Sequence, residues 1–368
     1  MNLPQALQQS REVLDQQIQE FFTRYEQEVA AVDPITVALA KRLHEYSTHS
    51  GKAARPLLVA VGAALSQNVT LEEVFAQRKV QLAMLVVEIT HKRILMADDV
   101  ADQDEQRHGV PSFHLQWESD LANDSLHQKL TPEFQKHMAR SYTEVAGIVY
   151  QNLSYYLLAD EAFSDTERRQ MLISLQRHTY DPTPAGWYLQ FLENFRSISE
   201  ITQEELYRCF ELITGEYSFV NPLQLGALLG QQEQQFEELF VRFGYPAGVL
   251  FQITDDIIGV LGDSQVSGKP VGNDFREGKK SLLVQYAYRQ GSQEQKAYLE
   301  KMIGNQAITN EETQQVTQLL RDLGAEEYTR SEAKKCADKA QAVLTELPEG
   351  EARILLSELI EYILRREK

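Results

Sequence analysis

Apolar residues recur at helical spacing along most of this chain. In the first thirty residues the repeat is three or four positions, and Asp33-Pro34 ends the segment. The residues that make this pattern are Leu3, Leu7, Leu14, Ile18, Phe21, Phe22, Tyr25 and Val29. The pattern predicts a long amphipathic helix at the start of the chain.

Further helices are expected downstream. A more apolar one starts at Pro56 ("PLLVAVGAAL"), and residues 71–99 are typical of one or two long helices. Loops are expected at 123–134, 180–187 and 261–280, and helix breaks near Gly324 and at "ELPEGE" (346–351). No alternating run typical of a strand, no repeat and no shift in composition is found. We therefore predict one all-α domain over residues 1–368.

The charge balance narrows the class of partner. With 36 Lys plus Arg against 54 Asp plus Glu, the net charge of −18 argues against nucleic acid. The two cysteines have no metal-ligand spacing, which favours a reducing cytoplasm. No secretory signal and no apolar run long enough for a transmembrane segment is expected.

Candidate chemistry begins with two acidic pairs. Asp98, Asp99 and Asp102 follow the apolar run 94–97, and Asp255-Asp256 follow another. One such pair alone is more often a solvated helix end. Two pairs at C-terminal helix ends, where the dipole opposes them, favour a site. Because carboxylate oxygens suit Mg²⁺, which is often held together with substrate phosphates, the pairs point to a diphosphate bound through magnesium.

A basic element precedes the first pair. In "SGKAARPLL" (50–58), Lys52 and Arg55 stand three residues apart beside an apolar helix. Alone this stretch is typical of a polar loop. Beside the acidic pairs it could clamp a second diphosphate, with Arg as a bidentate donor and Lys as a point charge.

These blocks, in this order, resemble the trans-isoprenyl diphosphate synthases, or polyprenyl synthetases. "GKAARP" is similar to the family's G-K-x-x-R-P, and "EITHKRILMADDVAD" to its first aspartate-rich motif. "FQITDDIIGVLGD" with "GKPVGNDFREGKKSLL" is similar to the second motif and its lysine-bearing loop, and 213–230 to the helix between them. Recognisable pattern covers about residues 45–115 and 205–285.

The resemblance implies a bundle of long antiparallel helices around a central cavity, usually in a homodimer. It implies a Mg²⁺-dependent, head-to-tail condensation of isopentenyl diphosphate with an allylic diphosphate. The metal would stabilise the departing diphosphate, and apolar helix faces would shield the allylic cation. A short- or medium-chain prenyl diphosphate would be the product.

The resemblance also assigns roles to residues. Asp98, Asp102 and Asp255 would ligate magnesium, with Asp99 and Asp256 in support. Lys52, Arg55 and His91 would bind isopentenyl diphosphate, although a histidine in such a helix is ordinarily a core residue. The allylic side would take Arg107 and His108, and the same pocket would be lined by Thr214, Gln252, Lys269 and Lys279.

The chain departs from the family pattern at several positions. Gly259 replaces the third aspartate of the second motif, His108 an arginine, and Ile213 a lysine. A usual aspartate near Gln190 is absent, and Gln151-Asn152 loosely replaces a Gly-Asp pair. Each lost charged contact would cost about 1.5–3 kcal/mol of binding.

The residues that set product length in the family are also unusual. They are here Lys92, Arg93 and Ile94, where small or aromatic residues are usual, and this bulk favours a short product. A buried Arg93 would have to snorkel or pair with an acid.

Two other functions stay open. A partner-dependent or non-catalytic subunit of a hetero-oligomeric synthase is favoured by the missing charges, and disfavoured by the intact aspartates and basic set. A class I terpene cyclase is disfavoured by "GKAAR" with His91, since a cyclase needs no second diphosphate site.

Overall fold

The computed structural model describes residues 1–49, 51–107, 109–123, 130–262 and 273–366. In these ranges helices joined by turns and short connections make up the chain, and its strands are one pair of two residues each, β1 (Gln106–Arg107) and β2 (Val110–Pro111). The prediction of an all-α fold is therefore confirmed. The chain divides into two compact units.

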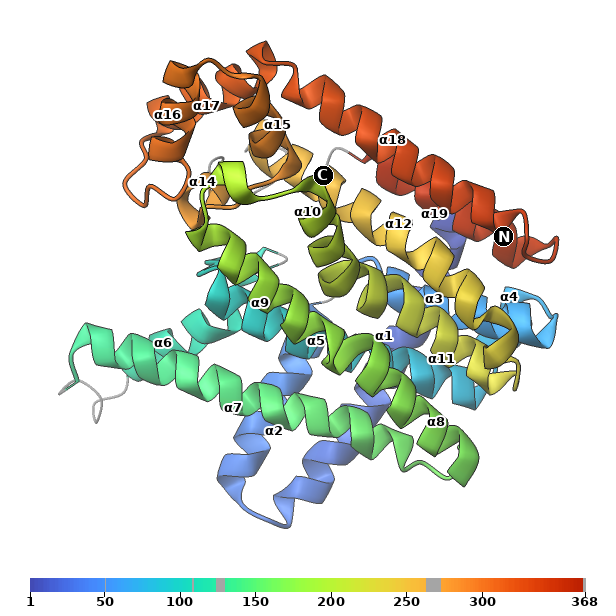
Figure 1. Cartoon of the computed structure of the whole chain (residues 1–368). Helices are drawn as coiled ribbons and strands as arrows, with labels where there is room; N and C mark the ends of the chain where they lie inside the picture. Colours follow the sequence, from blue (N-terminus) through green and yellow to red (C-terminus); the bar gives the residue numbers. More distant parts are fainter. Residues whose placement is uncertain (50, 108, 124–129, 263–272, 367–368) are drawn as a thin grey trace. The chain divides into compact units, whose positions relative to one another are not determined.

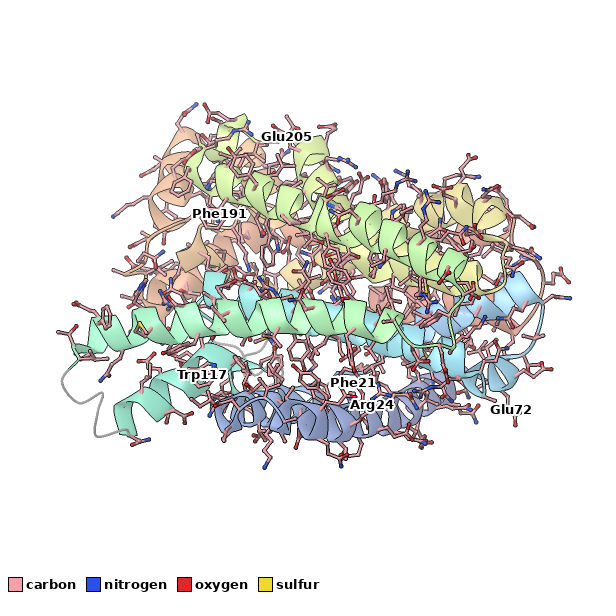
Figure 2. All side chains as sticks on the ribbon, turned by 90° about the horizontal axis from the view of Figure 1, so that it is seen from below. Phe21, Arg24, Glu72, Trp117, Phe191 and Glu205 are labelled. Carbon is pink, nitrogen blue, oxygen red and sulfur yellow. The ribbon has the colours of Figure 1, made fainter. Side chains whose placement is uncertain are left out.

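The first unit comprises residues 1–172 and 225–231. In it α1 packs against α2, α3 against α5, and α7 against both α5 and α6. Its helices are α1 (Leu3–Ala30), α2 (Pro34–Thr48), α3 (Ala54–Gln67), α4 (Leu71–Phe75), α5 (Arg78–Ala101), α6 (Phe113–Asn123), α7 (Pro132–Leu158) and the first part of α8 (Asp165–Leu175). Figure 2 shows Phe21 on the first of these helices, and its ring lies 6.3 Å from that of Tyr156 in α7.

The second unit comprises residues 173–224 and 232–368. Its long helix α12 packs against the π-helix η3 and against α18, beside which it runs in Figure 1. The elements are η1 (Gln176–Tyr180), α9 (Pro182–Phe195), η2 (Ile198–Glu200), α10 (Gln203–Phe210), η3 (Glu211–Val220), α12 (Glu233–Leu261), α14 (Asn273–Glu277), α15 (Leu282–Gln290), α16 (Gln293–Met302), α17 (Asn310–Asp322), α18 (Ala325–Leu344) and α19 (Glu351–Arg365). The helix α11 (Asn221–Leu229) passes from this unit into the first.

Several predicted boundaries are confirmed. Asp33 caps the N-terminus of α2 by accepting a hydrogen bond from the amide of Ile35 over 2.8 Å. The expected breaks near Gly324 and at residues 346–351 separate α17, α18 and α19. Residues 71–99 form two helices, α4 and α5.

Three expectations need correction. Residues 180–187 are helical rather than a loop, because Pro182 occupies the first position of α9, where a proline is tolerated. Asn273–Glu277 forms the short helix α14 inside the predicted loop 261–280, of which 263–272 lie outside the described residues. The strand pair was not expected, since two-residue strands leave no alternating pattern.

Candidate active site

The first acidic group stands at the C-terminal end of α5. Asp98 and Asp99 lie in the last turn of the helix, and Asp102 caps it with its amide 2.8 Å from the carbonyl oxygen of Asp98. Gln103 then adopts a left-handed backbone (φ +56°), which ends the helix. The apolar side chains earlier in α5 are buried and fix the helix in the core. Its aspartates therefore stand at a well-defined helix end.

The strand pair returns Arg107 to this helix end. Gly109, with φ +81°, supplies the left-handed residue between the two short strands. The Arg107 guanidinium donates to Asp99 from Nε (2.6 Å) and to Asp98 and Asp104 from Nη2 (3.1 and 3.2 Å). The three carboxylates are therefore gathered around one arginine.

The electrostatics of this group favour full ionisation of the arginine. Burial alone would lower the pKa of Arg107, but the charges of Asp99, Asp98 and Asp104 raise it above its ordinary value. Asp99 is fully buried, whereas Asp98 keeps about a third of its side chain exposed. Asp98 thus stays accessible to a ligand while Asp99 anchors the arginine.

The basic set lies in the same unit. The helix α3 begins at Ala54, two residues earlier than predicted, so that Arg55 stands in its first turn. Arg55 Nη1 lies 3.0 Å from Nε2 of His91 on α5. Because a guanidinium only donates, His91 accepts in this contact. Lys52 is exposed just before the helix.

In the second unit, close helix packing sets the positions of Thr214 and Gln252. A Cβ built on Gly248 would lie only 2.4 Å from the Cα of Gly215, so α12 and η3 meet there backbone to backbone. Thr214 is buried next to this contact, and Gln252 follows one turn after Gly248. The π-helical η3 is of a type frequently found at functional sites.

The second acidic pair lies on α12. Asp255 is exposed and Asp256 partly buried, and Oδ2 of Asp256 is buried with no hydrogen-bond partner among the described residues. Burial and the charge of Asp274 raise the pKa of Asp256 well above its usual range. A cation placed there would remove this cost.

Asp274 of α14 occupies the space beside Gly259. A Cβ on Gly259 would lie 2.6 Å from Asp274 Oδ2. A carboxylate from α14 thus stands next to the position where the family usually has a third aspartate. Lys279 forms ion pairs with Asp274 (3.4 Å) and Glu277 (2.9 Å).

An arginine that the sequence interpretation missed also reaches this pair. Arg366 follows α19, and its guanidinium stacks on the Phe251 ring with Cζ 4.0 Å from the centroid. It donates to the Phe251 carbonyl oxygen over 2.9 Å and forms an ion pair with Asp255. No sequence signal near residue 255 indicates this contact, because the two residues are 111 positions apart.

The candidate residues thus fall into two sets. The first unit holds Lys52, Arg55, His91, Asp98, Asp99, Asp102 and Arg107, and the second holds Thr214, Gln252, Asp255, Asp256 and Lys279. His108 and Lys269 lie outside the described residues. Asp104 and Asp274 were missed, although both stand within the motif-bearing stretches.

Two of the unusual residues have a structural reason. Ile213 packs against α9, where a Cβ on Gly186 would lie 2.5 Å from its Cγ2. Arg93 forms an ion pair with Glu144 of α7 (3.1 Å), which is one of the two arrangements expected for it. Within the described ranges, no three His, Cys, Asp or Glu side chains already converge as metal ligands.

Comparison with known proteins decides the family. A family profile described as Polyprenyl synthetase matches residues 37–320. The chain belongs to the polyprenyl synthetase family. It is accordingly a prenyltransferase of the trans-isoprenyl diphosphate synthase class.

The relatives include proteins named as prenyl diphosphate synthases. The chain is 30% identical to a geranylfarnesyl diphosphate synthase of Aeropyrum pernix over 86% of its own length and 91% of that protein. It is 26% identical to a geranylgeranyl diphosphate synthase of Saccharolobus solfataricus, over 89% and 91% of the two chains.

The solved structures support the same fold. A geranylgeranyl pyrophosphate synthase from Corynebacterium glutamicum, crystallised with isoprenyl diphosphate and magnesium, superposes over the full length of both chains. The TM-score is 0.86 at 22% identity. Among the described residues of this polyprenyl synthetase, no helix combines the length and apolar character that a membrane crossing requires.

Proposed function

We propose that this polyprenyl synthetase condenses isopentenyl diphosphate with an allylic diphosphate, head to tail, to a short- or medium-chain prenyl diphosphate. One observation carries the proposal: α5 bears both the His91 that contacts Arg55 and the aspartates that are tied to Arg107. A two-substrate diphosphate enzyme needs one cationic clamp and one carboxylate cluster. The names of the relatives in A. pernix and S. solfataricus support the product class.

Magnesium fits the residues present. Asp98, Asp102 and Asp255 offer the hard oxygen donors that this ion prefers, and the buried Oδ2 of Asp256 lacks a donor among the described residues. When bound, Mg²⁺ would supply Lewis-acid stabilisation of the departing diphosphate charge. We propose Mg²⁺ as the cofactor, with Asp99 and Asp256 in support.

The residues of the chain would act as binders and orienters. Lys52, Arg55 and His91 would hold isopentenyl diphosphate, since Arg offers a bidentate fork and Lys a point charge. Arg107, whose side chain is 17% exposed beside its aspartates, would bind the allylic diphosphate. Thr214, Gln252, Lys279 and, outside the described residues, His108 and Lys269 would complete the allylic side.

Assay of the purified chain tests the proposal directly. Isopentenyl diphosphate and Mg²⁺ are supplied with dimethylallyl, geranyl or farnesyl diphosphate, and pyrophosphate release and product length are measured. We expect release of pyrophosphate and a longer prenyl diphosphate. No turnover with any primer contradicts the proposal of an independent synthase.

A partner-dependent subunit is the second candidate. Ile213 supports this function. It stands where the family usually has a lysine, and it packs against Gly186 as an apolar side chain, so this position supplies no positive charge. This function predicts turnover only after a second, different synthase chain is added.

We propose that the chain forms a homodimer through exposed apolar stripes on α7 and α9. On α7, Tyr142, Val145 and Ile148 are between 42% and 57% exposed at helical spacing. On α9, Tyr188, Phe191 and Phe195 repeat the spacing at 57–83% exposure, and Figure 2 labels Phe191.

We also propose a cytoplasmic location. Both cysteines are buried free thiols, which supports a reducing compartment.

A further inference from the structure

The helix α2 ends immediately before the segment that carries the isopentenyl clamp, here called the 51–55 segment. A helix end leaves its last carbonyl groups without intrahelical donors, and carries a partial negative charge. Such an end attracts cations. Two cationic side chains, from helices α1 and α5, bind the carbonyl groups at this end of α2 and at the start of the 51–55 segment.

The first cation is Lys92 of α5. Its side chain is 2% exposed, and Nζ donates to the carbonyl oxygens of His49 (2.6 Å) and Tyr46 (3.2 Å). Nζ also lies 4.9 Å from the centroid of the Tyr46 ring. A lysine is almost never buried to this degree unless its charge is compensated.

Burial, and with it the nearby cations Arg11 and Arg107, lowers the pKa of Lys92 to about 8. Glu88 and Asp99 act in the opposite direction. The fold therefore bears a cost to keep this amine where it is, which an ordinary core position would avoid with an apolar residue.

The second cation is Arg11 of α1. It donates to the carbonyl oxygens of Thr48 (3.0 Å) and Gly51 (3.2 Å), and is itself held by Asp15. Its neighbour Ser10 donates to the carbonyl oxygen of Ala53 over 3.1 Å.

These contacts bear directly on the clamp. Ala53 precedes α3 with a left-handed backbone (φ +53°), a conformation that costs a non-glycine residue free energy and must be held by its surroundings. Lys52 lies between the two carbonyl groups bound by Arg11 and Ser10, and Arg55 stands two residues after Ala53. Lys92 adjoins His91, which contacts Arg55.

We propose that Lys92 and Arg11 are positioning residues of the isopentenyl diphosphate site, which fix the end of α2 and the 51–55 segment so that Lys52 and Arg55 face one diphosphate. The inference rests on the proposed function. It adds Arg11, which lies outside the motifs, and Lys92, which stands at a variable position of the first motif, and it gives each of them carbonyl oxygens to bind.

The test compares steady-state constants for the two substrates. Lys92→Met keeps the length of the side chain and removes the donor, whereas Arg11→Gln alters a more accessible residue and is less demanding on the core. We expect each variant to raise KM for isopentenyl diphosphate by about tenfold, with KM for the allylic diphosphate unchanged. Lys79→Met is the matched control, since Lys79 lies on the same helix and pairs instead with Glu167.

The outcomes separate the two proposals. An inactive wild-type chain sinks the proposed function itself. If the wild type is active but the variants show unchanged KM values, or equal changes in KM for both substrates, the positioning role is wrong. If Lys92→Met does not fold, as judged by circular dichroism, Arg11→Gln and hydrogen exchange of the 51–55 segment decide: faster exchange together with a selective rise in KM supports the role.

Discussion

Two arginines each bind an aspartate of one acidic group. Arg107 contacts Asp98 and Asp99, and Arg366 contacts Asp255. Each orients a carboxylate beside a buried apolar helix segment and offsets part of the repulsion between neighbouring like charges. Arg107 comes 8 residues after Asp99, whereas Arg366 comes 111 residues after Asp255, and each orients one carboxylate of its acidic group.

A substitution at Gly259 tests whether the neighbouring carboxylate of Asp274 contributes to activity. Gly259→Asp restores the usual family pattern, yet its side chain would enter the space of Asp274 Oδ2, 2.6 Å from the Cβ position. Steric overlap and like charge should then displace Asp274, and we expect kcat/KM to fall by about tenfold or more. Steady-state kinetics with purified variants measure this.

A double variant controls for that result. In Gly259→Asp with Asp274→Ala, the carboxylate moves from α14 to α12 without crowding, and activity should partly return. If Gly259→Asp alone matches the wild type, the proximity of Asp274 has no catalytic consequence.

At the scale of the helices, the contact of α5 with α7 determines where the side chain of Arg93 lies. Arg93 lies against Gly147, where a Cβ would be 2.8 Å from its Cδ, and pairs with Glu144. A glycine on α7 therefore gives this long side chain its room.

Arg93→Ala should lengthen the product, because the bulk before the first motif would be lost. Chromatography of the dephosphorylated prenyl alcohols gives the distribution. Glu144→Gln is the control, since it weakens a partly exposed ion pair worth below about 1 kcal/mol and leaves the bulk in place. Equal distributions in all three proteins would rule out Arg93 as a determinant of length.

The helix α9 carries a buried carboxyl with a pH-dependent cost. Burial, and next the charge of Glu205, raise the pKa of Glu193 to about 7. Because the folded state then binds more protons than the unfolded state between about pH 4.5 and 7, stability is highest below this window and falls as pH rises through it.

Urea denaturation at pH 5 and pH 8 checks this directly. The wild type should lose about 2 kcal/mol more than Glu193→Gln between these two pH values, after a discount for partial solvent screening. An equal loss in both proteins would mean that Glu193 titrates normally in the folded state.

At the scale of the whole molecule, the exposed stripes of α7 and α9 predict self-association. Val145→Glu and Phe195→Glu place charges at side chains that are 57% and 83% exposed, so folding should be preserved while a dimer is weakened. Sedimentation velocity should show a shift towards the monomer. Ile35→Glu, at an 81% exposed position on α2, is the control and should leave the mass unchanged.

The sequence by itself determined much of this protein. Apolar residues at helical spacing predict α1, α3 and α5 without any knowledge of contacts, because helix periodicity is local. The acidic pairs and the Lys52–Arg55 stretch could also be recognised from the sequence, because the spacing of a motif within one helix or loop is a local property. The prolines of 180–187 misled, because a proline marks a helix start as readily as a loop.

Tertiary structure decided which of these groups meet. Arg107 turns back onto Asp99, Asp274 fills the space beside Gly259, and Arg366 reaches Asp255 across more than a hundred residues. Charge and size are properties of a residue, but a contact depends on how helices pack. The sequence therefore identified the acidic and basic groups of this synthase, and only the packing of helices assigned their partners.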